Sequence, residues 1–289
     1  MPDLLPLRHG RMSRSAFTFY RGAALTMATD LAGTPVSGIR VQCCGDAHLC
    51  NFGGFATPER KVIFSINDLD ETLPAPWEWD VKRLAPSFVV ACRDNGLSDA
   101  AAKDVALTCV RSYRESMAEF SQLKTLELWY RSLTAEELIG GLPPDLRKRA
   151  LKRIEKEQAK SRGEELFPKL AEHRGGVPVI KDLLPTIFHN EEHRPGEVHK
   201  IMHAGLAAYR ATLSHYTQSL LDRYQLRDVA AKVVGVGSVG TLCLVFLMTA
   251  GDDDPLFLQV KEARTSVLEP FAGKSAFPNH GQRVVKSQH

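Results

Sequence analysis

The 289-residue chain has no long apolar run, no paired cysteine motif and no strong excess of one charge. No stretch approaches the roughly 18 consecutive apolar residues that a membrane-spanning helix needs. The first residues, MPDLLPLRHGRMSRS, lack the basic-then-apolar order of a signal peptide. The six cysteines contain no CxxC pair, which disfavours a disulfide framework and is typical of reduced thiols. We therefore expect a cytoplasmic protein without a membrane partner.

The charge pattern disfavours a nucleic-acid partner. The formal net charge of +3 is too small to indicate a polyanionic ligand by itself. The most charged segment, DLRKRALKRIEKEQAKSRGEEL from Asp145, mixes acidic with basic residues and places Leu146, Ala150, Leu151 and Ile154 on one stripe. This pattern is typical of a solvated amphipathic helix, which we favour over a phosphate-binding one. The hydrophobic content of 44% is ordinary for a globular protein.

The pattern of the first part of the chain alternates between helical and β-rich segments. Turn residues and capping residues separate these segments, and Asn95-Gly96 is a typical helix stop. The expected elements are a helix over 15–33, a strand over 38–44, a hairpin between the residues after Asn51 and a strand over 61–68, a helix from Trp77 to Asn95-Gly96, and a helix over 98–123 with Ser98 as its N-cap.

Composition divides the chain into three segments, 1–122, 123–225 and 226–289. The middle segment is helical and polar, with an expected loop over 175–195 and a helical pattern over 198–224. The last segment is β-branched and punctuated by glycine, and its GDDDP sequence predicts a turn between two strands. The sequence therefore predicts a mixed α+β fold.

A dense polar motif, CCGDAHLCNFGGF from Cys43 to Phe55, lies between two of the expected strands. Asp46 and Asn51 are five residues apart, and Asp68 ends the next β-rich run. Phosphoryl transfer uses such a set, because one Asp orients the attacking hydroxyl while an Asn and a second Asp hold magnesium. The motif therefore favours a phosphotransferase.

Two other chemistries use the residue types of this motif. A zinc site could draw on Cys43, Cys44, His48 and Cys50, but four ligands in eight residues do not match the paired spacing of structural zinc sites. Buried, inert thiols are the interpretation that we favour. A serine hydrolase is disfavoured because the chain has no G-x-S-x-G elbow.

The motifs also resemble those of known families. GDAHLCN resembles the HGDxHxxN loop of aminoglycoside and choline kinase-type phosphotransferases, which are relatives of the protein kinases, and FSINDLDE resembles their IDFxD metal segment. The ordered set FYRGAA, GDAHLCNFGGF, NDLDET, WEWDVKRLAPS, VVGVGSVGT and LQVKEA is similar to the bacterial DUF2252 family, from about Arg8 onward. The resemblance implies a kinase-like fold that uses ATP and Mg²⁺ on an unidentified acceptor.

The resemblance also implies roles for single residues. Asp46 takes the place of the catalytic aspartate, and His48 matches a histidine of the same loop, where it shapes the turn. Asn51 and Asp68 take the places of the two metal-binding residues, with Asp70 as a possible helper. The expected catalytic pair is therefore Asp46 and His48, and the expected metal site is Asn51, Asp68 and Asp70.

Residues around these motifs are expected to support them. Asp80 matches an aspartate that braces the loop by hydrogen bonding, and Arg21 in FYRGAA could reach a phosphate or brace the loop. For Arg21, capping of a helix or pairing with a helix carboxylate is an alternative that the sequence supports at least as well. We interpret Lys82-Arg83 as structural, and we expect Trp77 and Trp79 to pack in the core rather than line a pocket.

A glycine-rich segment lies near the end of the chain. Gly235, Gly237 and Gly240, with Ser238 between them, form GxGxxG, and the run that follows is strand-like rather than helical. This context favours a glycine-rich hairpin over ATP phosphates rather than a Rossmann dinucleotide site. Lys261 in VKEA resembles the phosphate-contacting lysine of kinases. The alternative is a buried hairpin with a solvated Lys261.

The order of these parts is inverted relative to ordinary kinases, since the glycine segment follows Asp46 by about 190 residues. We therefore expect a circularly permuted kinase-like fold, with a helix-rich catalytic lobe and a small β-rich nucleotide lobe. Only 28 residues follow Lys261, which predicts a C-terminally truncated family member. The alternative functions are an inactive nucleotide-binding pseudokinase, a nucleotidyl (AMP) transferase, or a structural or interaction protein.

Overall fold

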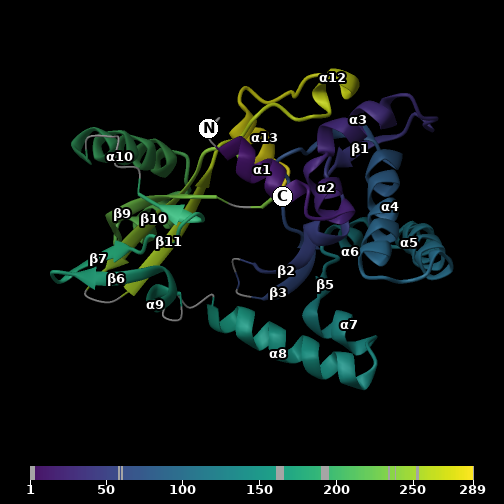
Figure 1. Ribbon diagram of the computed structural model, residues 1–289, viewed down its shortest axis with the longest axis horizontal. Helices are drawn as coiled ribbons and strands as arrows, with labels where there is room; N and C mark the ends of the chain where they lie inside the picture. The colour runs from purple at the N-terminus through teal and green to yellow at the C-terminus, as the bar shows by residue number, and fades with distance from the viewer. Residues whose placement is uncertain are drawn as a thin grey trace. The chain divides into compact units, whose positions relative to one another are not determined.

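The computed structural model describes residues 4–57, 59, 61–160, 166–189, 195–233, 235–237, 239–251 and 254–288 (Figure 1). The chain forms two compact units: Glu155–Glu262 make up most of unit 1, and Pro2–Ile154 with Ala263–His289 make up unit 2. The fold is mixed α+β with small antiparallel sheets, as predicted. The unit bounds differ from the three segments that composition suggested.

Unit 2 contains most of the helices and two small sheets. Strand β1 pairs antiparallel with β4, and β2, β3 and β5 form an antiparallel sheet in that order. In chain order the elements are α1 (Leu5–Met12), α2 (Ala16–Gly22), α3 (Ala24–Ala32), β1 (Arg40–Cys43), the 3-10 turn η2 (Leu49–Asn51), β2 (Phe52–Ala56), β3 (Val62–Ile66), β4 (Leu73–Pro76), α4 (Glu78–Asp94), α5 (Asp99–Phe120), α6 (Thr125–Trp129), β5 (Leu133–Thr134), α7 (Ala135–Gly140), α12 (Glu269–Ala272) and α13 (His280–Lys286). Helix α8 (Pro144–Lys160) crosses the boundary between the units.

The helix expected over 15–33 is two helices. Ser15 caps α2 by accepting a hydrogen bond from Thr18 N, but Ala23 leaves the helical region with φ −109° and ψ 34°. Gly22 lies directly against α1, because a Cβ there would meet Met12 Cγ at 2.8 Å. Packing of α1 therefore coincides with the end of α2.

Other local predictions in unit 2 are confirmed. Helix α5 begins after Ser98, whose hydroxyl accepts from Ala101 N at 3.2 Å. Helix α4 ends at Asn95, and Gly96 follows with φ +73°, a conformation that favours glycine. The predicted hairpin after Asn51 is the β2–β3 pair. Local signals were sufficient where a single residue type determines the backbone.

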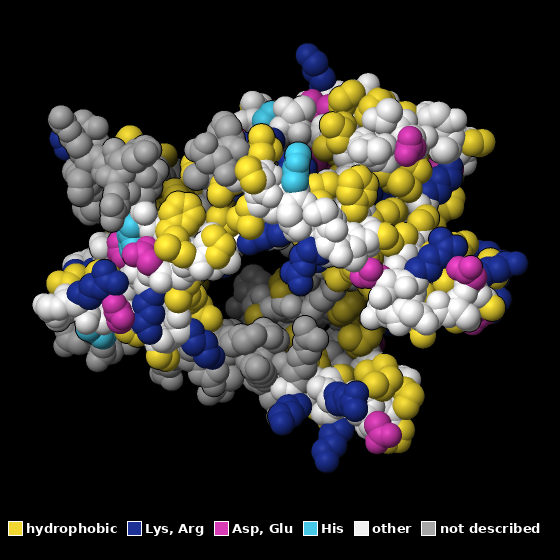
Figure 2. All heavy atoms as spheres, viewed as in Figure 1, with side chains coloured by type: hydrophobic (Ala, Val, Ile, Leu, Met, Phe, Trp, Pro, Cys, Tyr) yellow, Lys and Arg dark blue, Asp and Glu magenta, His cyan; other side chains and the backbone are white. Residues whose placement is uncertain are grey.

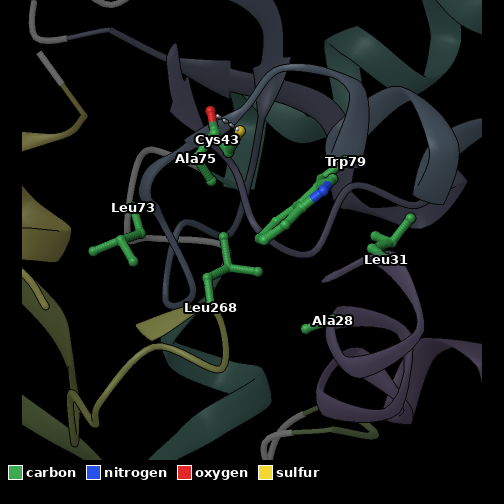
Figure 3. Packing of buried hydrophobic residues seen from close by; sticks show 7 residues of the cluster. All are labelled: Ala28, Leu31, Cys43, Leu73, Ala75, Trp79 and Leu268. Atoms are coloured by element: carbon green, nitrogen blue, oxygen red, sulfur yellow. Dashed lines mark hydrogen bonds between the residues drawn. The ribbon is translucent and has the colours of Figure 1, made fainter. Parts of the chain in front are cut away.

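The core of unit 2 joins segments from both ends of the chain. Figure 3 shows the buried cluster around Trp79. Trp79 is 5% exposed, which confirms the prediction that it packs in the core. Helix α12 also packs against α3 and β4. The cluster consists of Ala28 and Leu31 from α3, Cys43 from β1, Leu73 and Ala75 from β4, Trp79 from α4, and Leu268 from the C-terminal segment.

Arg283 of α13 fixes the C-terminal segment against the chain before β4. Its side chain is 1% exposed and donates to Thr72 O at 2.7 Å, Asp70 O at 2.8 Å and Arg264 O at 2.7 Å. Glu71, in the segment before β4, accepts a hydrogen bond in turn: its carboxylate accepts from Val267 N of the C-terminal segment at 2.6 Å. Ala263–His289 therefore supports the segment directly after Asp68.

Unit 1 is built on a four-stranded antiparallel sheet in the order β11-β10-β9-β8, with a second hairpin formed by β6 and β7. Its core contains Ala171, Ile180, Ile187, Ala230, Val245 and Leu247. Its elements are α9 (Phe167–Leu170), β6 (Ala171–Arg174), β7 (Val177–Ile180), β8 (Ile187–Phe188), α10 (Pro195–Ala211), α11 (His215–Leu221), β9 (Gln225–Lys232), β10 (Cys243–Ala250) and β11 (Asp254–Lys261).

Two expectations for this unit were wrong. The loop expected over 175–195 contains β7 and β8, because Gly175-Gly176, both with positive φ, form a tight turn rather than the start of a loop; residues 190–194 lie outside the described residues. The helix expected over 198–224 is interrupted, since Ser214 caps a separate α11 by accepting from Thr217 N. A capping residue such as Ser214 begins a new helix where hydrophobic periodicity alone predicts one continuous helix.

Charged side chains are interspersed on the drawn surface. In Figure 2, Lys and Arg side chains around α5 alternate with Asp and Glu instead of gathering in one patch. Within the described part of the chain, no helix is both long and apolar enough to cross a membrane.

We expect Arg283→Met to lower the free energy of unfolding of unit 2 by about 2–4 kcal/mol. It removes donors from three carbonyls, although loss of a buried cation offsets part of the penalty. The three tryptophans, Trp77, Trp79 and Trp129, all lie in unit 2, so urea unfolding followed by Trp fluorescence reports on this unit. The control Lys286→Met, at an exposed residue of the last turn of the same helix, should change stability by at most about 0.5 kcal/mol. Equal losses for both variants would contradict this role of Arg283.

Candidate functional site

One face of α4 holds the loop that carries Asp46. Asp80 accepts from Cys44 N at 2.6 Å and from Gly45 N at 3.0 Å, and Ser87 Oγ accepts from Leu49 N at 2.9 Å. Between them, Arg83 donates to Asp46. Positions 80, 83 and 87 lie on one side of a helix because they are three and four residues apart. Two side chains of α4 therefore fix the loop backbone, and a third fixes the Asp46 carboxylate.

Gly45 permits the close approach of this loop to the segment before β4. Its φ is +82°, and a Cβ at this position would lie 2.3 Å from Glu71 O. A side chain would therefore meet backbone as well as strained dihedrals. The glycine of the GD pair is a steric requirement of the loop.

Asp46 makes an ion pair with Arg83. Arg83 Nε lies 2.7 Å and Nη2 2.6 Å from Asp46 Oδ1, while Asp46 keeps 25% of its side chain exposed. Tyr20 of α2 supports the arginine: its ring centroid lies 4.8 Å from Arg83 Cζ, and its carbonyl accepts from Nη2 at 3.0 Å. His48 Nε2 is 4.0 Å from Asp46 Oδ2. Asp46 is thus a fixed and partly accessible carboxylate.

Burial is the largest cause of the pKa shifts of Asp46, His48 and Asp80. It raises the pKa of Asp46 to about 6, against the opposing effect of Arg83, and the nearby Asp68 and Asp80 raise it further. Burial lowers the pKa of His48 to about 4, with help from Arg83 and Arg21. Burial also raises the pKa of Asp80, although its two backbone donors oppose this. At pH 7, Asp46 is mostly a carboxylate and His48 is neutral.

The side chain of Asn51 connects the two segments that carry aspartates. Nδ2 donates to Asp46 O at 3.1 Å and to Asp68 O at 2.9 Å, and Oδ1 accepts from Asp68 N at 2.8 Å. Asn51 is 4% exposed. These partners fix which end of the amide is oxygen, and Oδ1 retains a second lone pair for another contact.

The donor types around Asn51 fit a magnesium ion. Asp68 Oδ1 accepts from Asp70 N at 3.0 Å, so a carboxylate and the Asn51 amide oxygen occur in one hydrogen-bonded unit. Hard oxygen donors of this kind suit Mg²⁺, which takes few protein ligands together with water and phosphate oxygens. No group of three or more His, Cys, Asp or Glu in the described residues could hold a metal alone. Asp70 enters the hydrogen-bond network through its backbone, which also accepts from Arg283.

The cysteines of the motif pack rather than converge. Cys43 and Cys44 are buried and Cys50 is exposed. Burial raises the pKa of the Cys43 thiol to about 12 and that of Cys44 as well, which keeps both protonated. Cys43 Sγ lies 3.5 Å from Ala75 O, the contact drawn in Figure 3. This arrangement fits buried thiols and gives no support to zinc.

The predicted glycine hairpin lies in unit 1. Its flanking strands β9 and β10 are antiparallel, and Gly235 and Gly240 have φ of +66° and +98°. Lys261 pairs with Cys243 at the start of β10, directly after the glycine segment. Gly237 is among the described residues of the segment, whereas Ser238 lies outside them. Strands β9, β10 and the lysine-bearing β11 thus lie in one sheet, and Gly235 and Gly240 belong to the connection between β9 and β10.

Sequence reasoning missed three contributors to the site. The sequence indicates a structural role for Arg83 but not its partner, Asp46; its position one turn after Asp80 is the available signal. Tyr20 supports Arg83 from a distant segment, and no local pattern indicates it. Glu71 was also missed: burial raises its pKa to about 6, and it ties the loop to the C-terminal segment.

The fold defines a mixed α+β protein. Its candidate site is a buried polar loop that helix α4 holds. This loop carries Asp46, and Asn51 bonds it to the segment of a second aspartate, Asp68. The chain belongs to the family of uncharacterized proteins conserved in bacteria, DUF2252, whose family model matches residues 1–289. No curated protein and no solved structure matches it.

We expect the Asp46 carboxyl to be half-ionised near pH 6 in a ¹³C NMR titration, with Asp46→Asn used for its assignment. Arg83→Gln should raise this pKa, because it removes a cation that stabilises the carboxylate. Asp68→Asn should lower it, because it removes a neighbouring negative charge. An Asp46 pKa near 4 in the wild type, or shifts of opposite sign, would contradict this account of the loop.

Proposed function

We propose that this protein is an ATP- and magnesium-dependent phosphotransferase with a circularly permuted kinase-like arrangement. The observation that carries the proposal is the Asn51 bridge, in which one side chain bonds both the Asp46 and the Asp68 segments. Phosphoryl transfer needs a base, an asparagine and a second aspartate in fixed relation. The bridge provides such a relation.

In this proposal Asp46 orients the acceptor hydroxyl and receives its proton. Its pKa of about 6 leaves it ionised at neutral pH while keeping it basic enough to accept a proton. Arg83 holds Oδ1, and Oδ2 is the oxygen nearer His48. We therefore assign Oδ2 to the acceptor. His48 is neutral at this pH and shapes the loop.

Asn51 and Asp68 would hold the magnesium ion, with Asp70 close by. A bound Mg²⁺ supplies positive charge that neutralises the nucleotide phosphates during transfer. In unit 1, the backbone at Gly235 and Gly240 and the Lys261 ammonium are the groups that we assign to phosphate binding. The positive φ of Gly235 and Gly240 supports this, because glycine allows backbone to approach a ligand closely.

An inactive nucleotide-binding protein is the second candidate. One observation favours it: the Asn51 amide already has protein partners on both of its ends. If those bonds persist with nucleotide bound, Asn51 acts as a brace and the metal depends on Asp68 alone. Transfer of labelled phosphate or of AMP from ATP to an acceptor would separate an active enzyme from this candidate.

We expect MgATP to stabilise the wild-type protein and Asp68→Ala to lose most of this effect. A ligand at 100 times its dissociation constant adds about 2.7 kcal/mol, which a thermal shift followed by Trp fluorescence detects. The Trp signal reports on unit 2, where Asp68 lies. Lys261→Met should also weaken the effect.

Asp30→Ala is the matched control, because Asp30 is an exposed carboxylate on α3 of the same unit. It should retain the full MgATP shift, and EDTA should abolish the shift in all variants. No MgATP shift in the wild type would overturn both nucleotide proposals. An equal shift in wild type and Asp68→Ala would overturn the assignment of the metal.

A further inference from the structure

Arg21, in the last turn of α2, lies beside the Asp46 loop. Its chain neighbour Tyr20 accepts a hydrogen bond from Arg83 Nη2 at 3.0 Å through its carbonyl, and Arg83 pairs with Asp46. The charge of Arg21 also reaches His48, since it contributes to the lowered pKa of that imidazole after burial and Arg83. Arg21 therefore belongs to the same cluster of side chains as Asp46 and His48.

Arg21 makes no ion pair within the described residues. Its guanidinium has no carboxylate or hydrogen-bond partner among them, although the residue is half-buried and Nε is fully buried. Arg83, by contrast, is compensated by Asp46 at 2.6 Å. A partly desolvated cation without a counter-ion is unfavourable, so this arrangement indicates an anion from outside the chain.

His48 supplies a second unused polar group at the same place. Its side chain is 9% exposed, and Nδ1 is buried without a partner among the described residues. A neutral imidazole donates from one nitrogen and accepts at the other, so a buried nitrogen needs a partner in either tautomer. His48 thus offers an unpartnered Nδ1, while its Nε2 lies 4.0 Å from Asp46 Oδ2.

We propose that Arg21 binds an oxyanion, a carboxylate or a phosphate group, carried by the molecule on which Asp46 acts. The planar guanidinium fork matches both groups, since each presents two oxygens in one plane to paired N–H donors. Anion binding is inferred from the nitrogens of Arg21 and His48 that have no partner among the described residues, and it does not depend on the proposed function. The assignment of this anion to the acceptor rests on the proposed function.

A purely structural role for Arg21 makes a different prediction. A bracing arginine would lose stability when shortened, because it would leave its partners unsatisfied. An uncompensated cation would not, because Arg21→Met keeps the apolar stem and removes the unpaired charge. The free Arg21→Met protein should therefore unfold at the same or a higher temperature than the wild type.

Anion binding is tested by NMR on the full chain without nucleotide. Inorganic phosphate and acetate are titrated separately at constant ionic strength, and the ¹⁵N signals of the His48 ring are followed. We expect saturable shifts with at least one of the two, and its identity distinguishes a phosphate-bearing from a carboxylate-bearing acceptor. Arg21→Gln should weaken binding at least tenfold, and Arg21→Lys should weaken it less because it keeps the charge but loses the fork.

Arg14→Gln is the matched control, because Arg14 is an exposed arginine shortly before α2. It should bind both anions as the wild type does. Saturation by neither anion, equal affinity in Arg21→Gln, or destabilisation by Arg21→Met with anion binding intact would each overturn the proposal.

A further measurement assigns the anion to the acceptor or to the nucleotide. Arg21→Gln should keep the MgATP thermal shift within twofold in apparent affinity, while Asp68→Ala loses it. A tenfold loss of MgATP affinity in Arg21→Gln would overturn the acceptor assignment. Absence of any MgATP shift in the wild type would remove the proposed function but would leave anion binding at Arg21 testable by its own titration.

Discussion

The candidate site depends on helix α4, whose side chains supply the partners of polar groups in the buried loop around Asp46. The residues from Cys44 to Leu49 place backbone N–H groups inside unit 2, where an unpaired donor is costly. Asp80 and Ser87 accept from these N–H groups, and Arg83 of the same helical face donates to the Asp46 carboxylate. The same contacts that stabilise the loop therefore determine the direction of the Asp46 carboxylate.

The second constraint is that distant segments must meet at this loop. Asn51 bonds to the Asp68 backbone, Glu71 to Val267 N, and Arg283 to three carbonyls around the same segment. The final residues of the chain thus belong to the support of the aspartate segments, although composition had grouped them with the glycine-rich strands. The position of the Asp68–Thr72 segment and the integrity of the C-terminal helix are therefore physically linked.

The sequence predicted what single residues determine locally. Ser98 as a cap, Asn95-Gly96 as a stop and the β2–β3 hairpin follow from capping and turn chemistry. It did not predict the break at Ala23, because that break coincides with packing of Met12 on Gly22. For the site, motif spacing indicated Asp46, Asn51 and Asp68, whereas the contacts of Tyr20 and Arg283 depend on tertiary structure. Periodicity contains no information about which distant segment supplies a partner.

The charges of the cluster argue for a ligand rather than a closed ion-pair network. Arg83 compensates Asp46, and Asp80 is satisfied by two backbone donors, so neither is available to Arg21. Arg21 is half-buried and its Nε has no partner among the described residues, so a ligand anion would complete its contacts. The same anion would lie next to the one carboxylate of the loop that burial leaves basic near neutral pH, which connects recognition with the proposed proton transfer.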